Sequence, residues 1–407
     1  MSDIMHKKII VVGGGAAGCM ASITASASGA DVTLIEKNKT VAKKILSTGN
    51  GKCNYCHDKI TPADYHLNDS YEFINTVLAK YPVSKCLDDF RALGITPLIK
   101  DGYVYPYSEQ AKSVTEVLTG ALKGVKVITE CSVTGIVKDG DKFTVKTSDK
   151  EFIADAVIVT TGGEAAPVTG STGDGYKFAK ALGLKQVKPV PALTSLTVKD
   201  HPYKKAAGVR IRATVTAVVE GKEAGSDTGQ VQITKTGFSG IPVFNISRFA
   251  TRALDEGRKV TLKVKFLPEL SDSEIRDELI RRLSRASHTA YDAMIGFFPD
   301  SFADALLRNA GVDPDKKVTD ASKVAEKLFN ASRNLNVVIT GSGDMASSQV
   351  TCGGVSLSEI DASTMQVKNH SGLYLAGEIL DIDGICGGYN LYFAWASGYI
   401  AGSSASL

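Results

Sequence analysis

A glycine-rich turn between two short apolar stretches constrains the fold of this chain more than any other feature. Lys8–Val12 and Asp31–Ile35 are short and rich in β-branched residues, as buried parallel strands are. Glycines interrupt the sequence after the first stretch, and Ala16–Ser28 then contains small residues that let a helix pack close to a sheet. The order strand, glycine turn, helix, strand predicts an α/β unit of the Rossmann-like type.

Each glycine of the pattern Gly13-x-Gly15-x-x-Gly18 has a role in binding a dinucleotide. Gly13 allows the tight turn, Gly15 lets the backbone approach a pyrophosphate, and Gly18 permits close packing of helix on strand. The helix N-terminus offers N–H groups and about half a positive charge to the pyrophosphate. Glu36 lies 18 residues after Gly18 and would accept hydrogen bonds from the adenosine ribose. The pattern predicts a dinucleotide site; the alternative is a structural glycine turn.

The glycine pattern alone does not choose between NAD and FAD, but two further segments favour FAD. Residues 43–54 form a polar loop, interrupted by glycines, whose donors suit an extended ligand. Leu373–Glu378 is predicted as a strand that ends in a glycine and an acid, and residues 387–390 then begin a helix. The N-terminus of that helix would stabilise negative charge on a flavin during reduction. The alternative is a glycine-capped turn without a ligand.

The length and the changes in composition predict several domains. A chain of 407 residues corresponds to roughly two to three domains. We predict a first part of the FAD-binding domain over 1–190, a β-rich insertion over 191–268, a helical domain over 269–336, and a C-terminal return to the FAD-binding domain over 337–407. The fold class is therefore α/β.

Charge and cysteine content narrow the classes of protein. The chain has 47 Lys and Arg against 44 Asp and Glu, so no nucleic-acid partner is expected, although local patches stay open. Seven scattered cysteines are not a secreted disulfide framework, which favours a reducing cytoplasm. Residues 6–12 resemble the start of a signal peptide, but three glycines interrupt the run. No stretch is long and apolar enough to predict a membrane span, and no spacing of His, Cys and carboxylates predicts a metal site.

Motifs along almost the whole chain resemble one family. Beside the N-terminal glycine pattern they are Thr48–Asn54, Thr236–Gly240, Gly353–Val355 and residues 376–391, in this order. Together they resemble the bacterial FAD-dependent oxidoreductases known as aminoacetone-oxidase-like, a family to which dehydro-bile-acid reductases are also similar. The resemblance implies a two-dinucleotide-binding-type FAD domain with an inserted β-barrel-like domain and a helical domain. The chain departs from the family at Lys235, where a histidine is usual.

The motifs and the resemblance together define the predicted FAD site, which takes residues from both ends of the chain. The predicted FAD-binding residues are Gly13, Gly14, Gly15, Ala16, Ala17, Gly18, Glu36, Lys37, Lys44, Ser47, Thr48, Gly49, Asn50, Gly51, Cys53, Asn54, Val133, Thr161, Gly162, Gly163, Asp174, Gly377, Glu378, Gly388, Tyr389, Asn390 and Leu391.

The predicted activity is a FAD-dependent oxidoreduction of a small or medium organic substrate. We favour an enone reductase, in which reduced flavin gives a hydride to a carbonyl-activated carbon–carbon double bond. Such a reaction needs a proton donor and an anion-stabilising group, for which Tyr389, Lys235 and Arg210 are the candidates. NAD(P)H, as a transient donor, or another reductant would supply the electrons. The alternatives are an aminoketone oxidase that produces peroxide and a flavin-dependent binding or RNA-modification protein. The sequence does not determine the oligomeric state.

Several other patterns have a structural explanation that we prefer to a functional one. We expect that Gly341-x-Gly343-x-x-Ala346 is not a second nucleotide site and that Cys53-x-x-Cys56 is not a redox disulfide. We expect His201 and His288 to be structural or surface histidines. We also expect Tyr103, Tyr105 and Tyr107 in an ordinary loop, and Phe393 and Trp395 in the core.

Overall fold

The computed structural model describes residues 6–67, 70–285 and 289–407 and divides into two units. Unit 1 consists of residues 1–189 and 350–407, and unit 2 of residues 190–349. His288 lies outside the described residues, so its role stays a prediction. The four domain ranges expected from the sequence also stay predictions.

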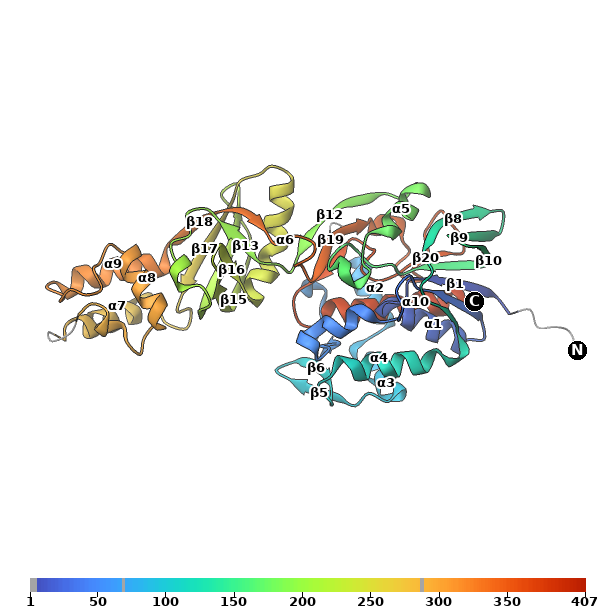
Figure 1. Ribbon diagram of the computed structural model, residues 1–407, viewed down its shortest axis with the longest axis horizontal. Coiled ribbons are helices and arrows are strands. Elements are labelled where there is room, and N and C mark those ends of the chain that lie inside the picture. Colours follow the sequence, from blue (N-terminus) through green and yellow to red (C-terminus); the bar gives the residue numbers. More distant parts are fainter. Residues whose placement is uncertain (1–5, 68–69, 286–288) are drawn as a thin grey trace, which may run out of the picture. The chain divides into compact units, whose positions relative to one another are not determined.

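A five-stranded parallel sheet forms the centre of unit 1 (Figure 1), with the order β20-β11-β1-β2-β7. The strands are β1 (Lys8–Val12), β2 (Asp31–Ile35), β7 (Lys126–Ile128), β11 (Ala156–Val159) and β20 (Leu373–Leu375). The C-terminal strand β20 thus joins the sheet of the N-terminal glycine motif, because β11 pairs with both β1 and β20. This arrangement confirms the predicted Rossmann-type fold.

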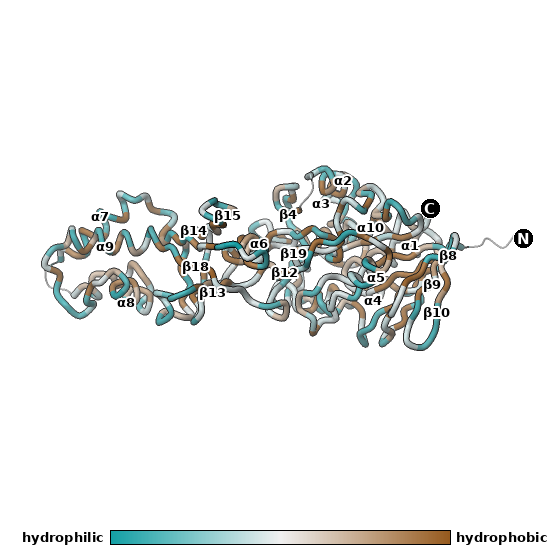
Figure 2. Tube along the Cα trace, turned by 90° about the horizontal axis from the view of Figure 1, so that it is seen from above, coloured by the Kyte–Doolittle hydropathy of each residue, from teal (hydrophilic) through white to brown (hydrophobic). Residues whose placement is uncertain are grey.

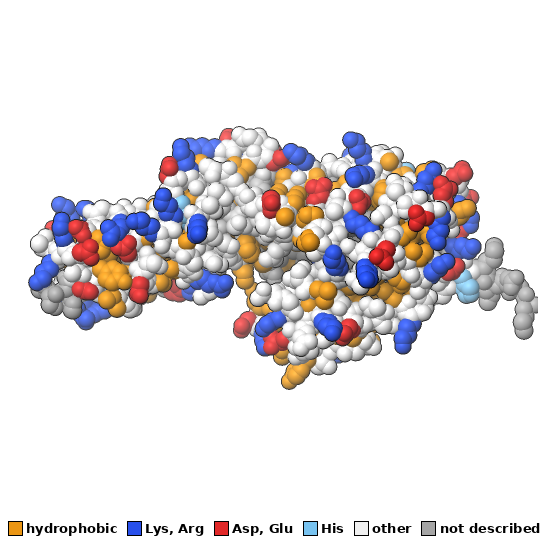
Figure 3. All heavy atoms as spheres, in the orientation of Figure 1, with side chains coloured by type: hydrophobic (Ala, Val, Ile, Leu, Met, Phe, Trp, Pro, Cys, Tyr) orange, Lys and Arg blue, Asp and Glu red, His pale blue; other side chains and the backbone are white. Residues whose placement is uncertain are grey.

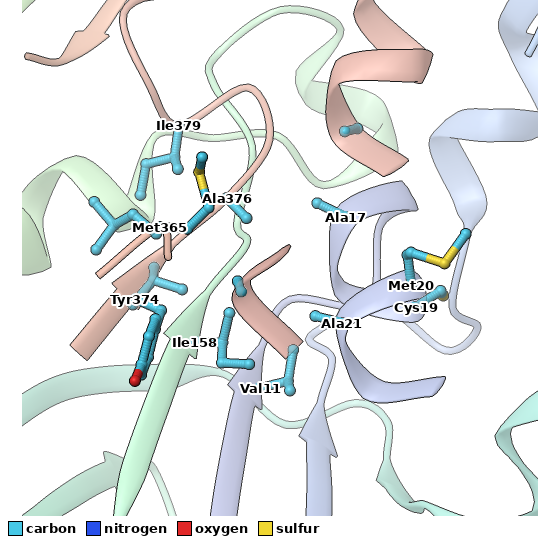
Figure 4. Close-up of a cluster of buried hydrophobic side chains, with 14 of the residues drawn as sticks. Val11, Ala17, Cys19, Met20, Ala21, Ile158, Met365, Tyr374, Ala376 and Ile379 are labelled. Carbon is cyan, nitrogen blue, oxygen red and sulfur yellow. The ribbon is translucent and has the colours of Figure 1, made fainter. Parts of the chain in front are cut away.

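Two helices of unit 1 pack closely through small residues. Helix α1 (Ala16–Ala27) follows β1, and α10 (Tyr389–Ala405) contains buried Phe393 and Trp395, as predicted. A Cβ on Gly398 would lie 2.4 Å from the carbonyl oxygen of Ala17, and one on Gly402 would lie 2.4 Å from that of Ala21. The helices therefore approach each other over the apolar core shown in Figure 4.

The remaining elements of unit 1 surround this core. The helices are α2 (Glu72–Lys80), α3 (Val83–Leu93), α4 (Ala111–Ala121) and α5 (Asp174–Ala181). Strands β8 (Val133–Asp139), β9 (Lys142–Thr147) and β10 (Glu151–Ala154) form one small antiparallel sheet, in which β8 and β9 make a hairpin. The other strands are β3 (Cys56–His57), β4 (Tyr65–Leu67), β5 (Pro97–Lys100), β6 (Tyr103–Pro106), β12 (Gln186–Ala192), β19 (Val350–Val355) and β21 (Ile382–Gly384).

The tyrosine-rich segment around residue 105 is a strand, so its interpretation as a loop is wrong. Strand β6 pairs with β3 on one side and with β5 on the other. The alternation of half-buried Tyr103 and Tyr105 with buried Val104 satisfies the two-residue period of a strand.

Unit 2 is a closed barrel with the strand order β13-β16-β15-β14-β17-β18. The strands are β13 (Leu196–Val198), β14 (Arg210–Val219), β15 (Lys222–Ile233), β16 (Gly237–Ser239), β17 (Val260–Phe266) and β18 (Leu335–Ser342). Helix α6 (Ile241–Asp255) follows β16 and contributes buried Val243, Ile246 and Ala250 to the core of the unit. Closure pairs the barrel edges within the unit.

Three helices lie between β17 and β18 in the sequence of unit 2. They are α7 (Asp272–Leu283), α8 (Asp300–Asn309) and α9 (Ala321–Arg333). Ser271 and Glu274 form a capping box at the start of α7, which explains where the helix begins. Figure 2 shows hydrophilic and hydrophobic residues alternating along α7 and α9, as expected of helices with one buried face.

Candidate functional site

The glycine turn of unit 1 contains two glycines that the fold requires and one that borders open space. Gly13 has φ +101°, and a Cβ there would lie 2.7 Å from the carbonyl oxygen of Thr160. A Cβ on Gly18 would lie 1.9 Å from the carbonyl oxygen of Gly13. By contrast, a Cβ on Gly15 would meet nothing within 4 Å. The turn is therefore tightly packed inside and open at Gly15, which fits a ligand that approaches the backbone there.

The first turn of α1 presents backbone donors at this open position. Gly15 is the N-cap residue, no side chain caps the helix, and no acidic residue lies in its first turn. Ala16 is half-buried and Ala17 is buried, so neither adds bulk. N–H groups and the positive end of the helix dipole suit a pyrophosphate. The turn thus fits the predicted dinucleotide.

Glu36 is held at the glycine turn by hydrogen bonds. Its side chain is buried, and its Oε2 atom accepts a hydrogen bond of 2.7 Å from the backbone N–H of Gly14. Its Oε1 atom accepts one of 2.7 Å from the backbone N–H of Asn38. The Oε1 atom also accepts a hydrogen bond of 2.7 Å from the side-chain amide of Asn38. Because a carboxylate oxygen accepts two hydrogen bonds, the Oε2 atom is the one that can still accept a ribose hydroxyl. Cys131, two residues before Val133, donates its N–H to the Glu36 carbonyl and places the start of β8 beside this region.

The polar loop of residues 43–54 has a left-handed backbone at consecutive positions. Gly49, Asn50 and Gly51 have φ values of +55°, +57° and +83°, and Cys53 has a φ of +57°. The hydroxyls of Ser47 and Thr48, outside this run, donate to backbone carbonyls of the same loop. A Cβ on Gly49 would lie 2.6 Å from the Asn54 backbone nitrogen, which explains why glycine is present.

The structure brings this loop to the start of α10, although some 330 residues separate them. A Cβ on Gly388 would lie 2.5 Å from the carbonyl oxygen of Cys56 and 2.9 Å from the Oδ1 atom of Asn54. Among the residues described, the buried Oδ1 atom of Asn54 has no hydrogen-bond partner. A buried acceptor without a partner is costly, so it fits a donor supplied by a ligand.

Four charged residues of the predicted site pair with one another. The Nζ atom of Lys44 lies 2.8 Å from the Oε2 atom of Glu378, and that of Lys37 lies 2.6 Å from the Oδ2 atom of Asp174. Glu378 also accepts a hydrogen bond from the backbone N–H of Thr351. These pairs hold the loops of unit 1 together, and contact of their side chains with a cofactor stays a prediction.

The loop after β11 contains tightly packed glycines of the predicted site. Gly162 has φ +72°, and a Cβ on Gly163 would lie 2.3 Å from the Oγ1 atom of Thr351. The Oγ1 atom of Thr161 is buried and has no hydrogen-bond partner among the described residues. This loop therefore offers a second buried polar atom that a ligand could satisfy.

The predicted residues at the other end of the chain mainly build the start of α10. Gly377 packs against Ala17, since a Cβ there would lie 2.9 Å from the Ala17 Cβ atom. The side chain of Asn390 exchanges two hydrogen bonds of 2.8 Å with the backbone of Gly384. Leu391 is half-buried in the first turn of the helix. The amide of Asn390 is thus used within the protein.

Tyr389 belongs to an aromatic cluster that sequence reasoning missed. The ring of His57 stacks on that of Tyr389 with centroids 5.1 Å apart, and Tyr103 meets His57 edge-on at 5.5 Å. The Tyr65 hydroxyl donates to the Tyr389 carbonyl oxygen at 2.9 Å. Burial, with the nearby Asp64 carboxylate, raises the pKa of the Tyr389 hydroxyl. The alternation of residues 103–106 was the one signal in the sequence that could have revealed this cluster.

The other two predicted catalytic residues belong to unit 2 and are exposed there. Arg210 begins β14, and Lys235 lies in the turn between β15 and β16. That Arg210 and Lys235 act in the same reaction as Tyr389 stays a prediction.

Three patterns with structural explanations are placed within the units. Cys53 and Cys56 are buried free thiols, so the structure has no disulfide there. Residues 343–349 form a loop in which Asp344 accepts the N–H of Ser347, so no nucleotide-binding helix follows Gly343. His201 is buried beside Phe238, with ring centroids 4.8 Å apart, and its structural role fits this packing.

The described residues contain neither a helix that could span a membrane nor a cluster of metal ligands. None of those helices has both the length and the hydropathy that a bilayer span needs. No three His, Cys, Asp or Glu side chains in that part of the chain are grouped as metal ligands.

Comparison with protein families identifies the fold family. Residues 7–404 match the model described as HI0933-like protein Rossmann domain. The chain belongs to this family. A 3-dehydro-bile acid delta(4,6)-reductase of Clostridium scindens is 38% identical, and the match covers 98% of this chain and 99% of that protein. A ribosomal RNA dihydrouridine synthase of Haemophilus influenzae is 27% identical, with 98% and 99% covered.

Among solved structures, a 3-ketosteroid delta1-dehydrogenase of Sterolibacterium denitrificans aligns with a TM-score of 0.53 at 13% identity, covering 98% of this chain and 99% of that one. This likeness concerns the fold. Membership of the HI0933-like family confirms the predicted resemblance, and the reductase relative supports the predicted class of FAD-dependent oxidoreductase.

Proposed function

We propose that this HI0933-like protein uses FAD to reduce a carbon–carbon double bond conjugated to a carbonyl group. The observation that carries the proposal is the 38% identity, over almost the full length of both chains, to a reductase whose name places double bonds beside a 3-oxo group. The open Gly15 position and the uncapped start of α1 support FAD as the cofactor. When bound and reduced, FAD supplies a hydride for the carbon β to the carbonyl.

Different residues of unit 1 hold different parts of the cofactor. The backbone from Gly13 to Gly18 and the start of α1 hold the pyrophosphate, because they combine N–H donors with space for phosphate oxygens. Glu36 holds the ribose, since its carboxylate is already oriented by Gly14 and Asn38. The Asn54 amide, beside Gly388, orients the cofactor through its unpartnered oxygen.

Tyr389 holds the proton that the substrate's α-carbon needs. Its raised pKa keeps the hydroxyl protonated through neutral and moderately alkaline pH. A protonated donor at Oη is the form that a general acid requires. Replacement by phenylalanine should lower turnover by about 100-fold or more, the usual share of a general acid, while FAD still binds, because the ring and the backbone of residue 389 are kept. In the parent, this group should cause no loss of rate as the pH rises to 10, where an ordinary tyrosine ionises.

The electron donor is also part of the proposal. No glycine turn followed by a helix occurs near Gly343, so NAD(P)H would visit transiently and leave before the substrate binds. That order predicts ping-pong kinetics.

A second candidate is reduction of uracil in RNA. Two relatives with the name ribosomal RNA dihydrouridine synthase are 27% and 25% identical, and each match covers at least 96% of both chains. Uracil also has a double bond conjugated to a carbonyl, so the same hydride and proton addition applies. The two candidates differ in substrate and share their chemistry.

Anaerobic reoxidation of the dithionite-reduced protein tests the reaction. A 3-oxo-4,6-diene steroid acid, a panel of small enones and a uridine-containing RNA are each mixed with it, and flavin absorbance is followed. We expect at least one conjugated acceptor to restore the oxidised spectrum far above the background rate. The proposal is wrong if none does so while aminoacetone bleaches the oxidised flavin and oxygen restores it with stoichiometric peroxide, because that result describes an aminoketone oxidase.

A further inference from the structure

The near-neutral charge of the whole chain conceals an uneven distribution between its two units. Unit 2 contains 23 Lys and Arg against 19 Asp and Glu, an excess of four, whereas unit 1 has 24 against 25. Figure 3 shows Lys and Arg side chains on the visible face of unit 2. Residues 199–210 and Lys235 account for the whole excess, and the other basic and acidic residues of unit 2 are equal in number.

Five basic residues make up this region, which we call the barrel-end patch. They are Lys199, Lys204, Lys205, Arg210 and Lys235. Asp200 is the one acid within the same two segments. All five basic residues are exposed, and in the described part of the chain none of them forms an ion pair.

Backbone hydrogen bonds bring the two segments to one end of the barrel. The N–H of Val198 donates to Thr236 at 3.0 Å, which places Lys199 near the turn that contains Lys235. The N–H of Gly208 donates to Ile233 at 2.9 Å, and Arg210 pairs with Gln232. Strand β13 ends, β14 begins, β15 ends and β16 begins at this barrel end, so the cations gather there.

Buried aromatic side chains pack beneath the residues of the patch. Tyr203 is fully buried, donates its hydroxyl to the carbonyl of Ala331 at 2.9 Å and meets Phe266 edge-on. Buried His201 lies against Phe238. The side chains of Lys204 and Lys205 follow directly on this anchored pair and point out to solvent as exposed residues.

We propose that the barrel-end patch binds the sugar–phosphate backbone of an RNA. Five cations in two segments that contain one acid are more than a single carboxylate or phosphate needs, and they suit a ligand with repeated negative charges. Lys and Arg are the usual phosphate contacts of nucleic-acid-binding proteins. The choice of RNA among polyanions rests on the second candidate function, whereas the charge argument is independent of any reaction.

Equilibrium binding of a fluorescein-labelled single-stranded RNA of about 20 nucleotides to the FAD-loaded protein tests this proposal. The patch variant replaces Lys204, Lys205, Arg210 and Lys235 by glutamine. The control variant replaces Lys316, Lys317, Lys323 and Lys327 by glutamine and so removes the same number of charges from exposed sites in the helical insertion. Flavin absorbance and the melting temperature check that both variants are folded.

We expect the patch variant to bind the RNA at least tenfold more weakly at about 100 mM salt, and the control variant to stay within twofold. The dependence of log K on log salt should have a slope near −3.5 in the parent, for about 0.7 per contact, and near −0.7 in the patch variant. Equal losses in both variants, or no loss in either, would overturn the proposal.

Competition separates RNA from other anions and from the reaction itself. Inorganic pyrophosphate, NADPH or a DNA of the same sequence that competes as well as RNA would also overturn the RNA assignment. Binding is measured without turnover, so the RNA-binding result can be interpreted even if only enones reoxidise the flavin. RNA binding without reduction of uridine would reject the second candidate function and would still support the barrel-end patch as an RNA-binding surface.

Discussion

At the residue scale, the fold requires Gly13 and Gly18 in the glycine turn, whereas Gly15 leaves space for a ligand. Gly13 and Gly18 contact the backbone of Thr160 and of Gly13 itself, so any Cβ there collides with main-chain atoms that cannot move away. Gly15 has an extended backbone, with φ −76°, and nothing within 4 Å of its missing Cβ. A Cβ atom there meets no protein atom, so a bound ligand would be what excludes it.

The contrast between two of these glycines gives a prediction. Gly15→Val should leave the apoprotein folded, with a loss of about 1 kcal/mol or less from the N-cap position, and should weaken FAD binding by at least tenfold. Gly18→Ala should unfold the protein or cost more than about 3 kcal/mol, because its Cβ would overlap a carbonyl oxygen. Thermal unfolding of the apoprotein and fluorescence titration with FAD measure both. Unchanged FAD affinity in Gly15→Val would mean that the turn is structural only.

At the element scale, the contact between α1 and α10 joins the two ends of the chain. Helix α1 begins at the glycine turn, and α10 begins at Gly388, beside Asn54. Gly398 and Gly402 let the two helices approach to backbone contact at Ala17 and Ala21. The packing of these helices therefore positions both halves of the candidate FAD site.

A glycine-to-alanine change in α10 tests this helix contact, and one in α4 serves as its control. Gly402→Ala should lower the free energy of unfolding by about 1–3 kcal/mol, because its Cβ would lie 2.4 Å from the Ala21 carbonyl oxygen. Gly120→Ala, in α4, should raise it by about 0.5–1 kcal/mol, because its Cβ would meet nothing within 4 Å and alanine favours the helix. Urea unfolding measures both. Stabilisation by Gly402→Ala would contradict the close contact.

At the scale of the whole molecule, the predicted functions divide between the units. Every predicted FAD-binding residue and Tyr389 belong to unit 1, whereas Lys235, Arg210 and the barrel-end patch belong to unit 2. Strands β12 and β19 pair where the chain leaves and re-enters unit 1, so the two ends of unit 1 lie close enough to be joined.

Removing unit 2 tests this division. A protein in which a short glycine–serine linker joins Pro189 to Val350 should fold and bind FAD within about tenfold of the parent affinity, because the cofactor residues and their core remain. Turnover of an enone should be lost, because the deletion removes Lys235 and Arg210, two of the predicted catalytic residues. Circular dichroism checks folding, and flavin titration and stopped-flow reoxidation give the two results. Full turnover without unit 2 would contradict the assignment of catalytic residues to it.

The sequence by itself determined the features whose physical causes are local. Strand period, glycine spacing and the acid at the end of β2 predicted the Rossmann-type unit, because backbone sterics and the helix dipole act within some 30 residues. The hairpin of β8 and β9, the start of α7 and the buried positions of Phe393 and Trp395 follow from turn chemistry, capping and hydropathy in the same way.

Only the tertiary structure decided which distant side chains meet. Stacking of His57 on Tyr389 and pairing of Lys44 with Glu378 join residues more than 300 positions apart, and no local pattern encodes such contacts. The strand of Tyr103 became clear only through its partners β3 and β5, because a short strand gains its stability from neighbours. The net charge of the chain does not reveal the barrel-end patch either. A net charge sums all residues, whereas a ligand responds to the positions of the charges in space.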